Sequence, residues 1–249
     1  MTFLSVFSDV LGYTSTLVWS LSFHFQWWEV WKVRSADGLS INFIFLNFIG
    51  FFYYFSYNLF AYVYTTDFSR QVHFSDLLFA AHALFLVSVH IVFLFTFPRH
   101  TNTINYYWIG FGVATILAVL VDAVVVRPGI ENVFVFMGLM KVLISFVKYL
   151  PQVYLNWKRK RTTGWSLENV LLDFVGGILS FIQIFVDWAD SGATNQFSGG
   201  LNIAKFLLAI VCIVFDLIFL FQHYVLYNPK NYKDKDTDAY DEEEKIHKH

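Results

Sequence analysis

Residues 148–177 read KYLPQVYLNWKRKRTTGWSLENVLLDFVGG, and a related stretch at 22–51 reads SFHFQWWEVWKVRSADGLSINFIFLNFIGF. A single offset aligns the two stretches throughout. It pairs Gln26 with Gln152, Trp31 with Trp157, Gly38 with Gly164, Ser40 with Ser166, and Asn47 with Asp173. Both copies lie in strongly apolar surroundings. Parallel repeats within a membrane chain are typical of transporters, whose binding site lies between the repeats.

The composition indicates a membrane protein with several spans. Hydrophobic residues make up 57% of the chain, aromatic residues 21% and charged residues only 14%. The apolar residues come in long blocks, which a soluble chain could not cover with so few polar residues. Cys212 is the single cysteine and lies inside an apolar block, so we predict neither a disulfide framework nor a metal site, and no cofactor.

Seven apolar blocks predict an all-α fold of seven transmembrane helices. Each block approaches or exceeds the ~20 residues that a helix needs to cross the hydrocarbon core. The blocks are 7–31, 39–64, 72–97, 105–126, 131–157, 165–188 and 200–227. Basic residues concentrate in loops 1–2, 3–4 and 5–6 and in the tail, so the positive-inside rule predicts a lumenal N-terminus and a cytosolic C-terminus.

The spacing of the repeats predicts a 3+1+3 arrangement. Two copies four helices apart, in the same direction, require an odd linker helix between two parallel three-helix bundles. We therefore expect a first bundle at 1–97, a linker helix at 98–130, a second bundle at 131–227 and a disordered cytosolic tail at 228–249.

Ionisable side chains inside the predicted spans are candidate functional groups, because each is costly in hydrocarbon without a partner or water. They are Asp76, Asp122, Asp173, Asp216, Lys141, Lys148 and Lys205. Lys141, Lys148 and Gln152 share one helical stripe, as do Asn169 and Asp173. A lining of lysine, acid and amide suits a zwitterion, although lysine–aspartate pairs can also simply hold helices together.

The Pro-Gln element has a mechanical interpretation. Pro151 removes a backbone donor inside its helix, and Gln152 can bridge the carbonyl group that is freed. We therefore predict a hinge at Pro151 and Gln152. In the first copy Phe25 replaces the proline while Gln26 remains, so we expect the hinge there to be stiffer.

These elements resemble the PQ-loop family, and within it the lysosomal cystine–proton symporters. The resemblance covers nearly the whole membrane part. It rests on segments around Asn47, Asp76 and Lys141, on the VKYLPQ run, on GWS through LLDFVGG, and on FDLIFLFQH. Phe25 stands where the family has the first PQ proline. We also expect the chain to differ from the family in lacking a large glycosylated lumenal domain and a tyrosine sorting motif.

The resemblance implies roles for individual residues. Asp173 resembles the family's central aspartate, which takes part in substrate binding and proton coupling, while Asp76 and Asp216 resemble aspartates implicated in proton movement. The positions matching the family's cystine site are Asn47, Lys141, Lys148, Asn169, Asp173 and Lys205.

The expected activity is thus proton-coupled export of L-cystine from a lysosomal, vacuolar or endosomal lumen by alternating access. Protons would be the coupling ion and the bilayer the only other partner that we predict; nothing indicates nucleic acid binding. Two alternatives remain open: a carrier of another small amino acid, and a seven-helix sorting or cargo receptor. An enzyme is not expected, since no metalloprotease motif, intramembrane aspartyl pair or nucleotide loop occurs.

Overall fold

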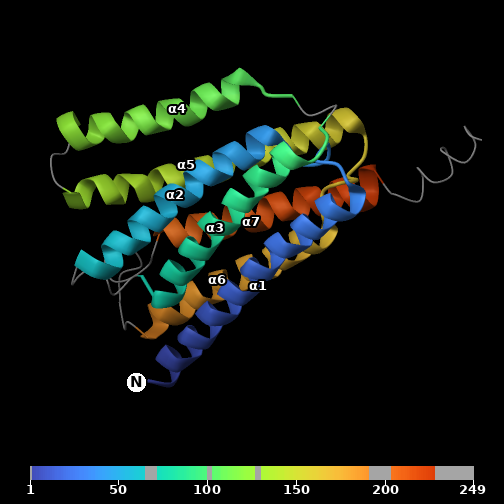
Figure 1. Cartoon of the computed structure of the whole chain (residues 1–249). Helices are drawn as coiled ribbons and strands as arrows, with labels where there is room; N and C mark the ends of the chain where they lie inside the picture. Colours follow the sequence, from blue (N-terminus) through green and yellow to red (C-terminus); the bar gives the residue numbers. More distant parts are fainter. Residues whose placement is uncertain (1, 65–71, 100–102, 127–129, 191–202, 228–249) are drawn as a thin grey trace, which may run out of the picture.

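Helices form almost all of the computed structural model, which describes residues 2–64, 72–99, 103–126, 130–190 and 203–227 (Figure 1). The seven α-helices of these ranges are α1 (Phe3–Val33), α2 (Ile41–Tyr64), α3 (Phe74–Thr96), α4 (Tyr106–Val121), α5 (Ile130–Arg159), α6 (Leu167–Asp190) and α7 (Ile203–Phe221). Short π-helical turns extend α4 (Asp122–Val126) and α7 (Gln222–Leu226). No strand occurs in these ranges, which confirms the all-helical prediction. The predicted tail at 228–249 lies outside the described residues.

Six helices, α2 to α7, are long and apolar enough to cross a bilayer. The remaining helix, α1, is also long, with 31 residues, but one of its faces is more polar. Its buried positions include Ser8, Ser15, Ser20 and Ser22. The seventh span expected at 7–31 therefore stays a prediction, and α1 buries its polar face against other helices.

The helices other than α4 close into a ring. α1 packs against α6 and α3, α3 against α2, α2 against α5, α5 against α7, and α7 against α6. α4 lies outside the ring against α2 and α5, at the top of Figure 1. Because α1–α6 and α2–α5 are the contacts that join the two sequence repeats, any space at the centre lies between the repeats.

The two repeats build the same turn after α1 and after α5. Arg34 and Lys160 occupy equivalent left-handed positions, with φ of 55° and 52°. Each turn then ends in a serine whose side-chain oxygen caps the following helix: Ser40 accepts from Phe43 N at 3.3 Å and Ser166 from Asn169 N at 3.1 Å. We call the end of the molecule that holds these turns the loop end. It lies on the right in Figure 1, and the start of α1 lies at the opposite end.

A glycine in each turn allows the two turns to touch. A Cβ atom on Gly38 would lie 2.4 Å from the Cα atom of Gly164, so no side chain fits there. Gly164 also has a φ of 86°, which other residues rarely adopt. The repeated glycine therefore brings the two repeats into backbone contact at the loop end.

Candidate functional site

A cavity lies inside the ring, between the two repeats. All six residues predicted to bind substrate line it: Asn47, Lys141, Lys148, Asn169, Asp173 and Lys205. Asp216 and Gln26 line it as well, whereas Asp76, Pro151 and Gln152 are not among its lining residues. The helical stripes read from the sequence therefore converge on one space, with Gln152 as the exception.

One wall of the cavity carries two buried lysines from α5. Lys148 Nζ donates to Asn47 Oδ1 of α2 at 2.8 Å, so this pair joins the two repeats. Lys141 Nζ lies 3.8 Å from the centroid of the Phe51 ring, in cation–π contact. Two cations that are held mainly by an amide and aromatic rings form a wall suited to an anionic group.

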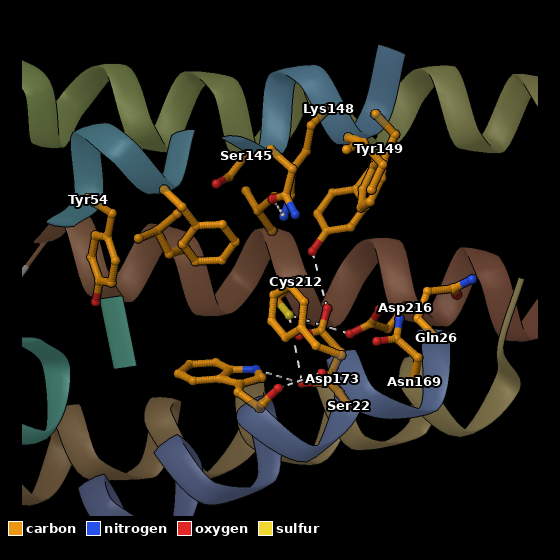
Figure 2. A pocket seen from close by; sticks show the side chains of 18 of the residues that line it. Ser22, Gln26, Tyr54, Ser145, Lys148, Tyr149, Asn169, Asp173, Cys212 and Asp216 are labelled. Atoms are coloured by element: carbon orange, nitrogen blue, oxygen red, sulfur yellow. Dashed lines mark hydrogen bonds between the residues drawn. The ribbon is translucent and has the colours of Figure 1, made fainter. Parts of the chain in front are cut away.

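Asp173 of α6 lies at the junction of several helices (Figure 2). Its Oδ2 accepts from Tyr149 Oη of α5 at 3.2 Å, and its backbone carbonyl accepts from Trp19 Nε1 of α1 at 3.2 Å. On α7, the Cys212 thiol lies 3.4 Å from Asp216 Oδ2 and 3.7 Å from the Asp173 carbonyl oxygen. Four helices thus meet at Asp173: α1 of the first repeat, and α5, α6 and α7 of the other half.

Asp173, Cys212 and Asp216 form the one cluster of metal-type donors found among the described residues. One ligand atom from each lies within 4.8 Å of the others. Two of these donors are already linked by the thiol–carboxylate hydrogen bond. The prediction that no metal binds stays a prediction.

Three further cavity residues were not predicted as site residues. Trp165, Ser180 and His90 are buried, and Trp165 Nε1, Ser180 Oγ and both His90 ring nitrogens have no hydrogen-bond partner within the described ranges. A buried polar group without a partner costs free energy, so water or a ligand in the cavity would be favoured beside them. The repeat could have indicated Trp165 as a site residue, because its indole, which carries an N–H donor, stands where the first copy has Leu39.

The two repeated glutamines cross between the repeats at the loop end. Gln26 accepts from Ser166 N at 3.0 Å and donates to the Gly164 carbonyl at 3.1 Å. Gln152 accepts from Ser40 N at 2.8 Å and donates to the Gly38 carbonyl at 2.8 Å. We call these two residues and their four hydrogen bonds the glutamine latch.

The latch corrects one expectation. Gln152 does not bridge a carbonyl group freed by Pro151, since its amide bonds to the other repeat and to Asn156 Oδ1 of its own helix. α5 continues through Pro151 to Arg159. The glutamine in each PQ element therefore joins the repeats, and the hinge role of Gln26, Pro151 and Gln152 stays a prediction.

A second set of contacts between the repeats lies at the opposite end. Lys205 Nζ of α7 lies 2.8 Å from Asp76 Oδ1 of α3, and it also donates to Gln183 Oε1 of α6 at 2.8 Å. Asp76 Oδ2 accepts from the His73 backbone N–H at 3.1 Å. Lys205 thus lines the cavity while its ammonium group is paired with Asp76. The sequence did not indicate this pairing.

His73 extends this set across three helices. Its Nδ1 lies 3.5 Å from Asp9 Oδ1 of α1, and its Nε2 lies 3.3 Å from Asp187 Oδ2 of α6. Asp187 also accepts a short hydrogen bond from Ser8 Oγ. We call Asp9, His73, Asp76, Asp187 and Lys205 the charged cluster. The hydrogen bond to Asp187 is the main reason why the pKa of His73, which lies just before the α3 span, is raised above its ordinary value.

Comparison with known proteins agrees with this architecture. The PQ loop repeat family model matches residues 7–65 and 133–190, which are the two repeats. A cystinosin homolog of Dictyostelium discoideum is 36% identical over 247 residues, covering 93% of this chain and 85% of its own. Cystinosin of Bos taurus is 33% identical over 241 residues, covering 91% of this chain and 65% of its own. A cystine transporter of Saccharomyces cerevisiae is 32% identical over 87 residues, covering 35% of this chain and 34% of its own.

Proposed function

Because this chain belongs to the cystinosin family of PQ-loop proteins, we propose that it exports L-cystine from a lysosomal, vacuolar or endosomal lumen to the cytosol together with a proton. The observation that carries this proposal is the cavity between the repeats. It places two cationic side chains, Lys141 and Lys148, in one cavity with the carboxyl groups of Asp173 and Asp216. A substrate that bears both carboxylates and ammonium groups fits a space lined by both signs of charge.

The proposed contacts follow from the chemistry of each lining residue. Lys141 and Lys148 would bind the carboxylates of cystine, and Asn47 and Asn169 would bind its ammonium groups. Lys205 would contact a carboxylate only when Asp76 releases it, because the two groups are paired at 2.8 Å. The unpartnered indole N–H of Trp165 would supply another donor to a carboxylate.

Asp173 is the residue that we propose to exchange the coupled proton. A charged side chain is costly inside the membrane, so an acidic lumen would load this site with a proton. Neutral Asp173 then carries no uncompensated charge through the change of conformation. On the cytosolic side the proton would leave, and the released carboxylate would weaken the binding of cystine carboxylates nearby. Asp216 and Asp76 would relay protons to and from Asp173. Asp216 is linked to Asp173 through the Cys212 thiol, which lies near both residues.

Alternating access is supported by the contacts between the repeats. The glutamine latch joins the repeats at the loop end, and the charged cluster joins the two halves at the opposite end. Breaking one of these sets of contacts would open the cavity to one side. The order α1–α3–α2 in one half and α5–α7–α6 in the other supports two three-helix bundles with α4 as linker. The positive-inside bias would make the loop end cytosolic.

The test is flux of labelled cystine in proteoliposomes, with and without an imposed pH gradient. We expect Asp173→Asn to abolish cystine-dependent proton current, and Asp122→Asn, an equivalent change outside the cavity, to leave it intact. Lysine, arginine and glucose serve as competitors that reveal another substrate. Cystine flux of Asp173→Asn with unchanged pH dependence would contradict the role of Asp173. Ligand binding without any flux would instead favour the receptor alternative.

A further inference from the structure

The charged cluster contains a titratable group that the transport chemistry above does not use. His73 lies between two aspartates on different helices, Asp9 of α1 and Asp187 of α6. α1 and α3 belong to the half with the first repeat, whereas α6 belongs to the half with the second repeat. A charge on His73 therefore acts on the contact between the halves.

We propose that His73 is a proton-binding site that closes the end opposite the loop end when it is protonated. An imidazolium ion donates from both nitrogens, so it can bond Asp9 through Nδ1 and Asp187 through Nε2 at the same time. A neutral imidazole keeps only one N–H and no positive charge, so both ion pairs are lost and at most one of the two hydrogen bonds remains. The proposal depends on the proposed function only in identifying this end as the one that faces an acidic lumen.

The surrounding groups favour the protonated form. His73 is faced by Asp9 from α1, Asp187 from α6 and Asp76 from its own α3, against the single cation Lys205 from α7. From α2, Tyr54 and Tyr57 lie near Asp76 and are not among the groups that act on His73. The hydrogen bond to Asp187, helped by the charges of Asp187 and Asp76, raises the pKa of His73 against the opposing effects of burial and Lys205.

Because the pKa of His73 is raised, its contribution to closing increases as the pH falls. A basic group whose pKa is raised in the closed arrangement stabilises it fully below the ordinary value of about 6.5. This contribution is lost as the pH rises through the raised pKa. An acidic lumen would therefore favour closing of the lumenal side after loading, and a lumen brought to neutral pH would leave that side open.

The position of His73 makes it distinct from the coupled proton. Its ring contacts Asp9 and Asp187 and it is not among the residues that line the cavity. It would thus set how the carrier responds to lumenal pH without being a stoichiometric proton site. A variant at His73 should change the pH profile while proton-coupled flux persists.

The experiment measures the distance between α3 and α6 at this end in the full-length protein in nanodiscs without substrate. Spin labels at Leu78→Cys and Phe185→Cys, both exposed positions, report the distance by pulsed electron resonance from pH 5 to pH 8. A parent that carries only Cys212, which is buried, gives the background labelling. We expect the closed population to gain about five- to tenfold over the open one as the pH falls, the range that two partly exposed ion pairs supply.

Variants identify the group responsible. His73→Gln and Asp187→Asn should each reduce this pH response to less than about twofold, since each removes the ion pair between α3 and α6. His24→Gln is the matched control, because His24 is exposed, hydrogen-bonds the Ser20 carbonyl of its own helix and contacts no member of the charged cluster. A pH response that persists in His73→Gln, or that is missing from the parent, overturns the proposal.

The same proteins separate this inference from the proposed function. In proteoliposomes with equal pH on both sides, His73→Gln should retain cystine exchange but lose its acceleration at acidic pH. If no variant and no parent moves cystine while the distances still follow pH, the proposed substrate is wrong and the proton-binding site stands. If cystine flux is normal and the distances ignore pH, the proton-binding site is wrong and the transport function stands.

Discussion

The contacts that join the two repeats differ in chemistry between the two ends of the ring. At the loop end, Gln26 and Gln152 bond the backbone of the other repeat, and every partner is neutral. At the opposite end, the contact depends on Lys205, His73 and carboxylates. Neutral amide hydrogen bonds do not change between pH 5 and pH 8, whereas a histidine–carboxylate contact does. One end can therefore respond to pH, and the other end responds only to the conformation of the repeats.

The repeat explains why the ends differ. The latch residues occur in both copies of the repeat, so the loop end has two equivalent halves. The charged cluster has no such copy, because the repeat offset places Val135, Ala61 and Phe79 opposite Asp9, Asp187 and Lys205. The symmetric loop end suits a contact that depends on conformation alone. The asymmetric end suits a contact that depends on the pH of the compartment it faces.

The largest effect is expected from Gly38→Val at the loop end. Its Cβ would lie 2.4 Å from a backbone atom of Gly164, which has no side chain that could turn away. We expect cystine flux to fall by two orders of magnitude or more, because this end could no longer close. Gly110→Val is the control, since no atom lies within 4 Å of a Cβ there. Normal flux in a folded Gly38→Val protein would show that backbone contact of the turns is not needed.

A comparably large effect is expected at the charged end, on stability and not on flux. Asp76→Asn or Lys205→Met alone leaves its buried partner uncompensated, which costs about 3–5 kcal/mol in comparable buried pairs. The double variant should recover much of that loss, because neither charge remains. Chemical unfolding of the four proteins in detergent measures the coupling. Additive losses in the double variant would mean that the pair at 2.8 Å is not energetically linked.

The smallest effect should come from the latch glutamines. Gln26→Ala and Gln152→Ala each remove two neutral hydrogen bonds between the repeats, each worth about 0.5–1.5 kcal/mol. Cystine flux should fall roughly tenfold in both variants, by similar factors and equally at pH 5 and pH 7. Unequal losses in the two variants would show that the missing first proline alters the transport cycle. A loss that depends on pH would contradict the claim that only the charged end responds to pH.

Much of the site could be predicted from the sequence because helical periodicity fixes which residues share a face. The stripes of Lys141 with Lys148 and of Asn169 with Asp173 both reach the cavity. Periodicity does not say which residue of another helix lies opposite. It therefore missed that Lys205 pairs with Asp76, and it assigned Gln152 to its own helix when its partners are in the other repeat.

The sequence by itself determined the apolar helices, the duplication and the polar stripes, since these follow from the order of residues along one chain. It also identified the turn glycines, Gly38 and Gly164. Why glycine is needed there is visible only in the structure, where the two turns touch. The tertiary structure alone decided the contacts between helices: the crossed glutamines, the junction at Asp173, and His73 between two aspartates. Those contacts join residues far apart in the chain, and no local spacing encodes the distance between them.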